Sequence, residues 1–396
     1  MSQDFVRRLP NFGAGFARSF VWVDKIHLDM LLLLLLMATT CYGLLILYSA
    51  SGEAGGSFFF SASSEAGDNN LPEAVIAQLM KFSIATFVML FLAQISPVFY
   101  LRLAPWLFCL GLLFLVLVLA FGTEINGSKR WLRIPGVAGF QPSELMKLVV
   151  PLMLAWYFHD RHLPPRTKHI FWALVMILVP VLLIANQPDL GTSLVIGAAG
   201  LLVLFLAGIR WRNVFGAMIA MLASAPALWF LLKDYQKQRI LTMWDPERDP
   251  LGAGWNIIQS KTAIGSGGLF GKGLFQGTQS HLDFLPESQT DFIISVLAEE
   301  LGLFGIVILL ILYILLIGRG LIMAVQAQDT FGRLLAGSIT FTFFVYVFVN
   351  IGMVSGVLPV VGIPLPLVSY GGTSIVTIFA GFGILMSIHT HRRIML

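Results

Sequence analysis

The sequence predicts an all-α polytopic membrane protein with about ten transmembrane helices. Of its 396 residues, 57% are hydrophobic and only 12% are charged, whereas about 25% of the residues in a soluble chain are charged. Apolar runs of about 20 residues, the length that a helix needs to cross a bilayer, recur along the chain. A soluble fold cannot bury that much apolar surface. Cys41 and Cys109 both lie inside apolar runs, so we expect neither a disulfide framework nor a cysteine metal cluster.

Ten apolar runs give the expected transmembrane helices. The first is too long for the apolar core of a signal peptide and further runs follow it, so we expect no cleavable signal peptide. An even number of crossings places both termini on the same side of the membrane. The runs cover residues 29–49, 75–96, 104–122, 143–159, 170–186, 190–208, 214–232, 291–317, 334–358 and 371–388.

The distribution of Lys and Arg predicts which side of the membrane holds the termini. Fourteen of these residues, including Arg319 and Arg333 between the eighth and ninth runs, fall in tails and loops on the side of the termini. The opposite short loops, at residues 50–74, 187–189 and 359–370, contain none. Because basic loops stay in the cytoplasm, we expect both termini to be cytoplasmic.

The chain is expected to form one membrane domain, residues 29–388, between cytoplasmic tails at 1–28 and 389–396. Residues 51–72, rich in Ser, Gly, Ala and Phe, are typical of a flexible outer loop. Segment 233–290 would be a long extracytoplasmic loop between the seventh and eighth helices, too long for a simple connector. Its aromatic residues argue against disorder, so we expect it to pack over the helix ends.

Two outer segments depart from the charge pattern. Loop 123–142 holds Lys129, Arg130 and Arg133, and segment 233–290 carries six more basic residues. Basic residues in a short outer loop oppose the insertion preference. We favour an anionic ligand at the outer surface as the compensation, over the alternative that strongly hydrophobic neighbouring helices tolerate the misplaced charges.

The fourth run opens with ionisable residues, which are costly within a membrane. Ser143 is a candidate N-cap with Pro142 just before it. Glu144 and Lys147 are three residues apart and lie on one face of the helix, where they can pair. The pair can be a structural ion pair or can orient an anionic substrate, and the two roles are compatible.

One aspartate, Asp189, precedes the sixth run, and another, Asp291, opens the eighth. Capping of a helix is sufficient to explain Asp189. Thr290 or Asp291 can cap the eighth helix, but Asp291 also lies at the mouth of an apolar run beneath a basic and aromatic loop. Such a carboxylate suits proton abstraction from a hydroxyl. The sequence therefore leaves two roles open for Asp291, helix cap and general base. Glu299 and Glu300, deeper in the run, are expected to pair or hydrogen-bond within the bundle.

The glycine-rich segment 265–273 invites comparison with phosphate-binding loops, but its spacing fails the Walker pattern and it is expected outside, away from ATP. A turn in which the backbone approaches a lipid headgroup closely is the alternative. His281, His389 and His391 form no pattern typical of metal ligands.

Several motifs resemble the SEDS (shape, elongation, division, sporulation) family, and within it the rod-shape-determining RodA type. The resemblance runs from about residue 30 to the C-terminus; two segments, 249–254 and 259–268, resemble the elongation branch, and the 51–72 insertion looks unusual for the family. The motifs are Gly-Ser-Lys-Arg-Trp at 127–131, Gln-Pro-Ser-Glu at 141–144, Gln-Pro-Asp-Leu-Gly-Thr at 187–192, Leu-Pro-Glu-Ser-Gln-Thr-Asp-Phe at 285–292, and Pro-Leu-Pro-Leu-Val-Ser-Tyr-Gly-Gly at 364–372.

The resemblance implies a peptidoglycan glycosyltransferase that polymerises lipid II at the outer face of the inner membrane during cell elongation, with inversion at the anomeric carbon. Asp291 matches the essential aspartate of the family and would be the general base. Lys129 and Arg130 would stabilise charge on the leaving pyrophosphate. Trp131 would form a wall of the sugar or lipid site. The remaining candidates in or near the motifs are Glu144 and Lys147 for substrate binding, and Gln187, Asp189, Gln259, Lys261, Glu287, Thr290 and Ser369 as supporting residues.

The resemblance also implies partners: lipid II, a class B penicillin-binding protein transpeptidase and the rod-elongation proteins, with no nucleic acid. It implies no certain cofactor and leaves a requirement for a divalent cation, Mg²⁺ or Mn²⁺, open. Two alternatives differ in class from the enzyme. A lipid II flippase would carry paired repeats and ion sites at the membrane midplane, whereas the candidate residues here cluster at the outer ends of the helices. A non-catalytic scaffold for the transpeptidase leaves Asp291 and the basic outer loop unexplained.

Overall fold

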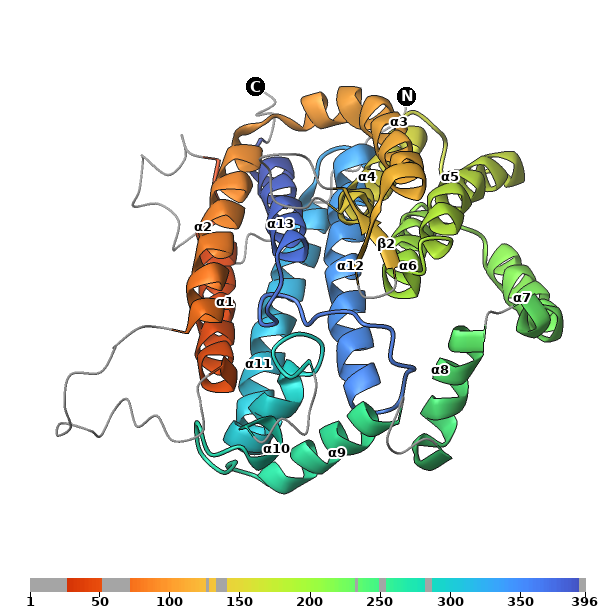
Figure 1. The fold of residues 1–396 in the computed structure, drawn as a ribbon. Helices are drawn as coiled ribbons and strands as arrows, with labels where there is room; N and C mark the ends of the chain where they lie inside the picture. The colour runs from red at the N-terminus through yellow and green to blue at the C-terminus, as the bar shows by residue number, and fades with distance from the viewer. Residues whose placement is uncertain are drawn as a thin grey trace.

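The protein is described by a computed structural model that covers residues 27–51, 72–125, 128–132, 141–231, 234–248, 254–281 and 287–391. Ten long helices correspond one to one with the ten predicted runs (Figure 1). They are α1 (Met30–Ser51), α2 (Glu73–Gln94), α3 (Pro97–Phe121), α4 (Pro142–Phe158), α5 (Thr167–Ala185), α6 (Leu190–Leu206), α7 (Trp211–Leu231), α11 (Ile293–Gln326), α12 (Thr330–Val354) and α13 (Thr373–Thr390).

Most of these helices have the length and composition of membrane spans. In the described ranges, seven are long and apolar enough to cross a membrane, namely α1, α2, α3, α5, α11, α12 and α13, and α6 is a shorter apolar helix. The predicted fold class, an all-helical polytopic membrane protein, is confirmed. Within the described part of the chain, the sheet consists of a short antiparallel hairpin, β1 (Thr123–Ile125) with β2 (Ser128–Trp131), in the loop between α3 and α4.

The helices α12 and α13 form the inside of the bundle. Most of their residues are buried, whereas α2, α3 and α5 keep most of theirs at the surface. In Figure 1, α12 stands near the centre, and it packs against α11, α6 and α4, while α13 packs against α2. The polar residues on α4, α12 and α13 are therefore shielded from lipid by the outer helices, which reduces the cost of placing them at membrane depth.

The predicted long loop after α7 is largely structured. Its described parts form α8 (Asp234–Trp244), the short 3₁₀ helix η2 (Pro246–Arg248), α9 (Trp255–Gly267) and α10 (Thr278–His281). In Figure 1, α9 and α10 lie at the lower end of the bundle, and α8 stands at its right. The helix α9 packs against α11, and the Ser260 hydroxyl donates to the Val354 carbonyl at the end of α12 at 2.9 Å. The expectation that this loop packs over the helix ends is confirmed for α9 and α10, which pack against α11, whereas α8 packs against η2.

The glycine-rich segment 265–273 closes a break in α11. Gly302 has φ 64° and ψ −158°, so the helix is interrupted there. The carbonyls of Glu299 and Glu300 on one side of the break accept from the backbone amides of Lys272 and Gly273, at 3.0 and 2.9 Å. On the other side, the Leu303 and Phe304 amides donate to Gly268 and Leu269. Backbone groups freed by the break thus find partners, as membrane burial requires.

The Glu299 side chain holds the same segment, as expected for a polar residue bonded within the bundle. Its carboxylate accepts from Lys272 Nζ at 2.6 Å and from the backbone amide of Thr278 at 2.7 Å. The turn is therefore fixed both by backbone pairing and by a buried carboxylate.

The predicted loop basic residues Arg319 and Arg333 lie inside helices, and this corrects their assignment. The helix α11 ends at Gln326 instead of residue 317, and α12 begins at Thr330 instead of residue 334. The Arg319 guanidinium pairs with the Asp29 carboxylate, and His389 lies 3.7 Å from the same carboxylate. A long side chain paired in this way can extend a helix to the membrane surface. The His389–Asp29 contact also joins the N-terminal end of α1 to the C-terminal end of α13, so these two helix ends lie at the same end of the bundle.

The third helix likewise begins earlier than expected, at Pro97 instead of residue 104. Proline suits the first helical position because its missing N–H has no intrahelical partner there. The Tyr100 hydroxyl then donates to the Leu92 carbonyl at 2.6 Å, which fixes the tight α2–α3 corner. Arg102, expected in the loop, therefore lies in the first turns of α3.

Candidate active site

Two adjoining cavities share a wall formed by β2, α4 and the start of α13. The first is polar, with a volume of about 190 Å³, and its wall includes residues of β2, α4, the start of α6 and α12. The second, about 560 Å³, is lined almost entirely by apolar side chains of α2, α3, α4 and α13. Both are lined by Trp131, Glu144, Gly372 and Thr373, so the two cavities are neighbours.

The hairpin residue Arg130 forms part of the polar cavity. Its guanidinium donates to the Pro188 carbonyl at 2.7 Å and lies 3.8 Å from the Asp189 carboxylate. Asp189 also accepts from the Gln141 side chain at 3.1 Å and from the Thr192 amide at 3.2 Å. Asp189 is thus the N-cap of α6, as predicted, and it additionally fixes Arg130 and Gln141 at the cavity wall.

Two further predicted residues, Gln187 and Lys129, are not among the described residues that line the polar cavity. The Gln187 side chain donates to the Leu115 carbonyl at 3.0 Å, so it ties the turn before α6 to α3. The backbone of Lys129 pairs with Glu124 across the hairpin, but its side chain lies outside the described part of the structure. Arg133 also lies outside the described residues.

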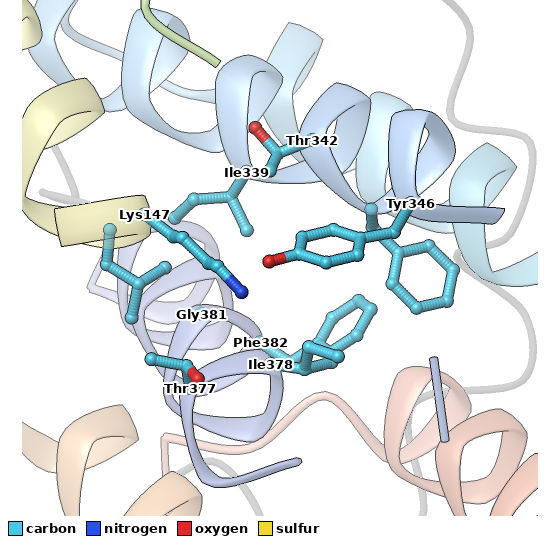
Figure 2. A pocket seen from close by; sticks show the side chains of 10 residues that line it. Lys147, Ile339, Thr342, Tyr346, Thr377, Ile378, Gly381 and Phe382 are labelled. Carbon is cyan, nitrogen blue, oxygen red and sulfur yellow. The ribbon is translucent and has the colours of Figure 1, made fainter. Parts of the chain in front are cut away.

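The predicted pair on α4 is formed and buried. Lys147 Nζ lies 2.5 Å from a Glu144 oxygen, and the other Glu144 oxygen accepts from the Thr377 hydroxyl of α13 at 3.0 Å. Figure 2 shows the Lys147 ammonium directed toward Tyr346, with the ammonium 4.9 Å from the ring centre. Thr342 and Thr377 line the same small cavity, of about 40 Å³, between α4, α12 and α13. The pair therefore joins three helices and also borders the polar cavity.

The predicted cap of α4 is wrong. Gln141 is the N-cap residue and α4 begins at Pro142, so Ser143 lies within the first turn, where its buried hydroxyl has no hydrogen-bond partner among the described residues. Proline fixes the backbone angle that the first helical position needs, and the helix therefore starts two residues earlier than a cap at Ser143 would allow.

Asp291 lies in the turn before α11 and does not cap that helix. Phe292 is the N-cap residue, and in the described part of the chain no side chain makes a capping hydrogen bond to this helix. Thr290 is not a cap either, because its hydroxyl donates to the Glu287 carboxylate at 2.6 Å. The Asp291 carboxylate instead packs against Gly362, where a Cβ atom would be 3.4 Å from Oδ2. Gly362 lines the polar cavity, so the carboxylate lies at its edge.

The surroundings of Asp291 suit a base. Burial raises the pKa of the Asp291 carboxyl to about 6, and the negative charge of Glu287 adds to the rise. The positive charges of Arg239 and Arg130 oppose it. A carboxylate with this pKa is ionised at neutral pH and accepts a proton more readily than an ordinary one.

The Asp291 turn is held by the segment after α12. The Ser369 hydroxyl donates to the Thr290 carbonyl at 2.5 Å, and the Tyr370 amide donates to the Gln289 carbonyl at 2.8 Å. Ser369 itself is buried and its hydroxyl accepts from the Leu365 amide at 2.8 Å. Ser369 therefore stabilises the Asp291 turn by linking it to the segment after α12.

The predicted supporting residues Gln259 and Lys261 are not brought to the polar cavity. Both lie on α9, and the Lys261 side chain packs where a Cβ atom on Gly356 would stand. Gln78, Lys81, Tyr346 and Asn350 were not among the residues predicted from the sequence. Gln78, Lys81 and Asn350 are polar residues in apolar spans, which is the same sequence signal that identified Glu144.

The apolar cavity has a cation at its wall. Lys81 of α2 lines it and places its ammonium 3.6 Å from the centre of the Tyr370 ring. Across the described ranges, no three His, Cys, Asp or Glu side chains gather closely enough to hold a metal ion. The geometry thus offers a base, basic side chains beside a polar cavity and a large apolar cavity next to it.

Known proteins resemble the chain over nearly its whole length. A family model described as cell cycle protein FtsW/RodA/SpoVE matches residues 29–394. The peptidoglycan glycosyltransferase MrdB of Escherichia coli (strain K12) is 52% identical over 373 residues, which are 94% of this chain and 96% of the relative. The probable peptidoglycan glycosyltransferase FtsW of Geobacter metallireducens is 40% identical over 289 residues, 72% of this chain and 76% of the relative.

Solved structures agree. The rod shape determining protein RodA of Thermus thermophilus superposes with a TM-score of 0.67 at 30% identity, covering 92% of this chain and 97% of that chain. A chain from a peptidoglycan synthase complex that coordinates polymerization and crosslinking has a TM-score of 0.76 at 31% identity, covering 91% and 97%. Sequence and fold together lead to one assignment: this chain belongs to the FtsW/RodA/SpoVE family.

Proposed function

We propose that this protein is a peptidoglycan glycosyltransferase that polymerises lipid II into glycan strands at the outer face of the inner membrane during cell elongation. The 52% identity with MrdB over 94% of the chain supports the activity. The observation that carries the mechanism is the Asp291 carboxylate, half-buried at the edge of a polar cavity with a pKa raised to about 6.

In the proposed reaction, the 4-hydroxyl of an incoming GlcNAc attacks the anomeric carbon of the lipid-linked chain. Asp291 accepts the hydroxyl proton as the new C–O bond forms. The bond from the anomeric carbon to the phosphate oxygen breaks on the opposite side, so the configuration inverts and the polyprenyl pyrophosphate leaves with the electron pair. A pyrophosphate leaving group needs no protonation by a general acid, which fits a single carboxylate at this position.

Arg130 is proposed to stabilise the charge that grows on the pyrophosphate, together with Lys129 on the same strand. Its guanidinium is held by the Pro188 carbonyl and lies 3.8 Å from Asp189, so its position at the cavity wall is fixed before substrate binds. Fixed donors of this kind favour the transition state because they need little rearrangement as charge develops.

The two cavities match the two halves of a lipid-linked sugar. The polar cavity suits the pyrophosphate and sugars, and the apolar cavity beside it suits part of the polyprenyl chain. Trp131 and Glu144 line both, so we assign them to the junction. The Glu144–Lys147 pair, already neutralised internally, is proposed to shape this junction and orient the substrate.

We also propose the cellular setting. Both termini are cytoplasmic and the Asp291 side of the bundle faces outward, in line with the charge distribution of the loops. A relative belongs to a peptidoglycan synthase complex that coordinates polymerization and crosslinking. We therefore propose a class B penicillin-binding protein transpeptidase and other rod-elongation proteins as partners.

The deciding experiment supplies lipid II in detergent to the purified full-length protein and separates the glycan chains by length. Asp291→Asn keeps the size of the side chain but removes its basicity, so turnover should fall by about 100-fold or more. Asp245→Asn removes an exposed carboxylate from the same loop region and should leave the rate unchanged. Parallel reactions with Mg²⁺, Mn²⁺ or EDTA measure any dependence on a divalent cation.

Three outcomes would contradict the proposal. If Asp291→Asn made glycan chains at the wild-type rate, Asp291 would not be the general base. Movement of lipid II across liposomes without chain synthesis would instead identify a flippase. An inert purified protein that still binds the transpeptidase would identify a scaffold.

A further inference from the structure

We propose that Asn350 is a positioning residue, which fixes Asp291 at the polar cavity by binding the backbone of two separate segments at once. The proposal rests on the function proposed above for Asp291. Asn350 lies on α12, one turn before its end, and is 0% exposed. Its amide nitrogen donates to the Asp291 carbonyl at 2.9 Å and to the Ile363 carbonyl at 2.7 Å.

The amide nitrogen of asparagine has two hydrogens, and both are used here. One goes to the turn before α11 and the other to the irregular segment between α12 and α13. Neither carbonyl takes part in a helix ladder, so each depends on a side chain for a partner at this depth. The Asn350 side-chain oxygen has no hydrogen-bond partner in the described structure. The described contacts of the Asn350 amide group are therefore made by its two N–H donors.

The two bonds bring Asp291 and the Gly362–Ile363 backbone together. The residue before Ile363 is Gly362, whose φ is +73° and whose absent Cβ would be 3.4 Å from Asp291 Oδ2. This backbone is the side of the polar cavity against which the carboxylate packs. Ser369 and Tyr370 fix the carbonyls of Thr290 and Gln289, and Asn350 acts at Asp291 itself.

This arrangement links Asn350 to the proton affinity of Asp291. Burial is the largest cause of the raised pKa of Asp291, ahead of the charge of Glu287 in its own turn. Arg130 from β2 and Arg239 from α8 act in the opposite direction. If the turn moves away from Gly362, the carboxylate gains water and its pKa falls toward the ordinary value of about 4.

The test uses Asn350→Leu, which keeps approximate volume, removes both donors and adds no charge near Asp291. The full-length variant polymerises lipid II across a range of pH. We expect kcat to fall by about tenfold to hundredfold, with a smaller change in KM. The midpoint of the acid limb should move below that of the wild type.

Ser338→Ala is the matched control, because the Ser338 hydroxyl is also buried on α12 and donates to the Ala199 carbonyl at 3.1 Å, away from Asp291. It should lower thermal stability without moving the acid limb. If Asn350→Leu does not fold, Asn350→Ser, which keeps one hydroxyl donor, gives the same readout.

The outcomes separate the two proposals. An acid limb that is present in the wild type, absent in Asp291→Asn and unmoved in the Asn350 variants would overturn the positioning role alone. Full activity of Asp291→Asn would overturn the general base, and the role of Asn350 with it. A lower rate that only follows the folded fraction, with an unmoved midpoint, would make Asn350 a structural residue.

Discussion

Single polar residues in this bundle fall into two groups according to what satisfies them. Gln78, Gln187, Asn350 and Ser369 have their side chains bonded to backbone carbonyls of other segments. Such bonds stabilise irregular backbone that would otherwise be unpaired at membrane depth. The Asp291 carboxylate instead lies at a cavity edge with its proton affinity raised. This contrast, more than polarity alone, separates bracing residues from the proposed base.

Glu287 should tune the pH dependence of the reaction. Its negative charge helps to raise the pKa of Asp291 to about 6, so the ionised base is lost as pH falls through that value. Glu287→Gln keeps an acceptor for the Thr290 hydroxyl but removes the charge. The pKa of Asp291 should then fall, and the acid limb of the rate profile should move to lower pH.

The measurement is the initial rate of lipid II polymerisation between pH 5 and 8 for wild type and Glu287→Gln. The variant should keep more of its maximal rate than the wild type near pH 5.5. An acid limb that moves upward, or stays in place, would show that Glu287 does not act on the base through its charge.

Among the secondary-structure elements, α11 differs most from its prediction. The apolar run 291–317 predicts one continuous span, but Gly302 interrupts the helix and the 268–273 turn occupies the break. On the Asp291 side of the break, every residue from Ile293 to Glu300 is buried. The break lets a short, enclosed helical segment carry Asp291 while the rest of α11 meets the membrane surroundings.

Gly271→Ala should destabilise this junction. A Cβ atom there would be 2.1 Å from the Glu300 carbonyl oxygen, and the backbone has φ +79°. The left-handed conformation alone costs roughly 1–2 kcal/mol in a residue with a Cβ. The protein in detergent should therefore melt at a lower temperature, and the loss should exceed that estimate because the backbone must also shift.

Gly265→Ala is the control for this prediction. Gly265 lies within α9 and a Cβ atom there would meet nothing within 4 Å. Alanine is favoured over glycine in a helix by about 1 kcal/mol, so the melting temperature should stay equal or rise. Equal melting of Gly271→Ala and wild type would mean that the turn is not packed into the break.

The molecule as a whole is arranged around one polar region inside an apolar bundle. The ends of α1, α11 and α13 are joined by Asp29, Arg319 and His389 at one end, and α9 and α10 cover the other (Figure 1). Asp291 lies just before the first residue of α11, at the end of the bundle opposite the ion pairs of Asp29. The orientation in the membrane then decides which compartment the base faces.

Orientation can be tested by labelling single cysteines with a membrane-impermeant maleimide in intact spheroplasts, after Cys41 and Cys109 are replaced by Ala. Asp245→Cys, in the loop after α8, should react from outside. Asp160→Cys, between α4 and α5 where the native side chain is 85% exposed, should react only after the membrane is opened. The reverse pattern would place Asp291 in the wrong compartment for the proposed reaction.

The sequence by itself determined the fold class, the ten long helices and five residues that line the polar cavity, Arg130, Trp131, Glu144, Lys147 and Asp189. Apolar length and charge bias are local properties, and they survive folding because the bilayer imposes them on each helix separately. Pairing of Glu144 with Lys147 and capping by Asp189 were also predictable, since both depend on spacing within a few residues.

Only the tertiary structure decided which candidate carboxylate caps a helix and which lies at the edge of the polar cavity. The capping and catalytic readings of Asp291 share the same local sequence, and they differ in its contact with Gly362, more than 70 residues away along the chain. The role of Asn350, the break at Gly302 and the distance of Gln259 and Lys261 from the cavity depend likewise on long-range packing. Such contacts join segments whose separation in sequence carries no periodic signal, so their partners appear only when the helices are assembled.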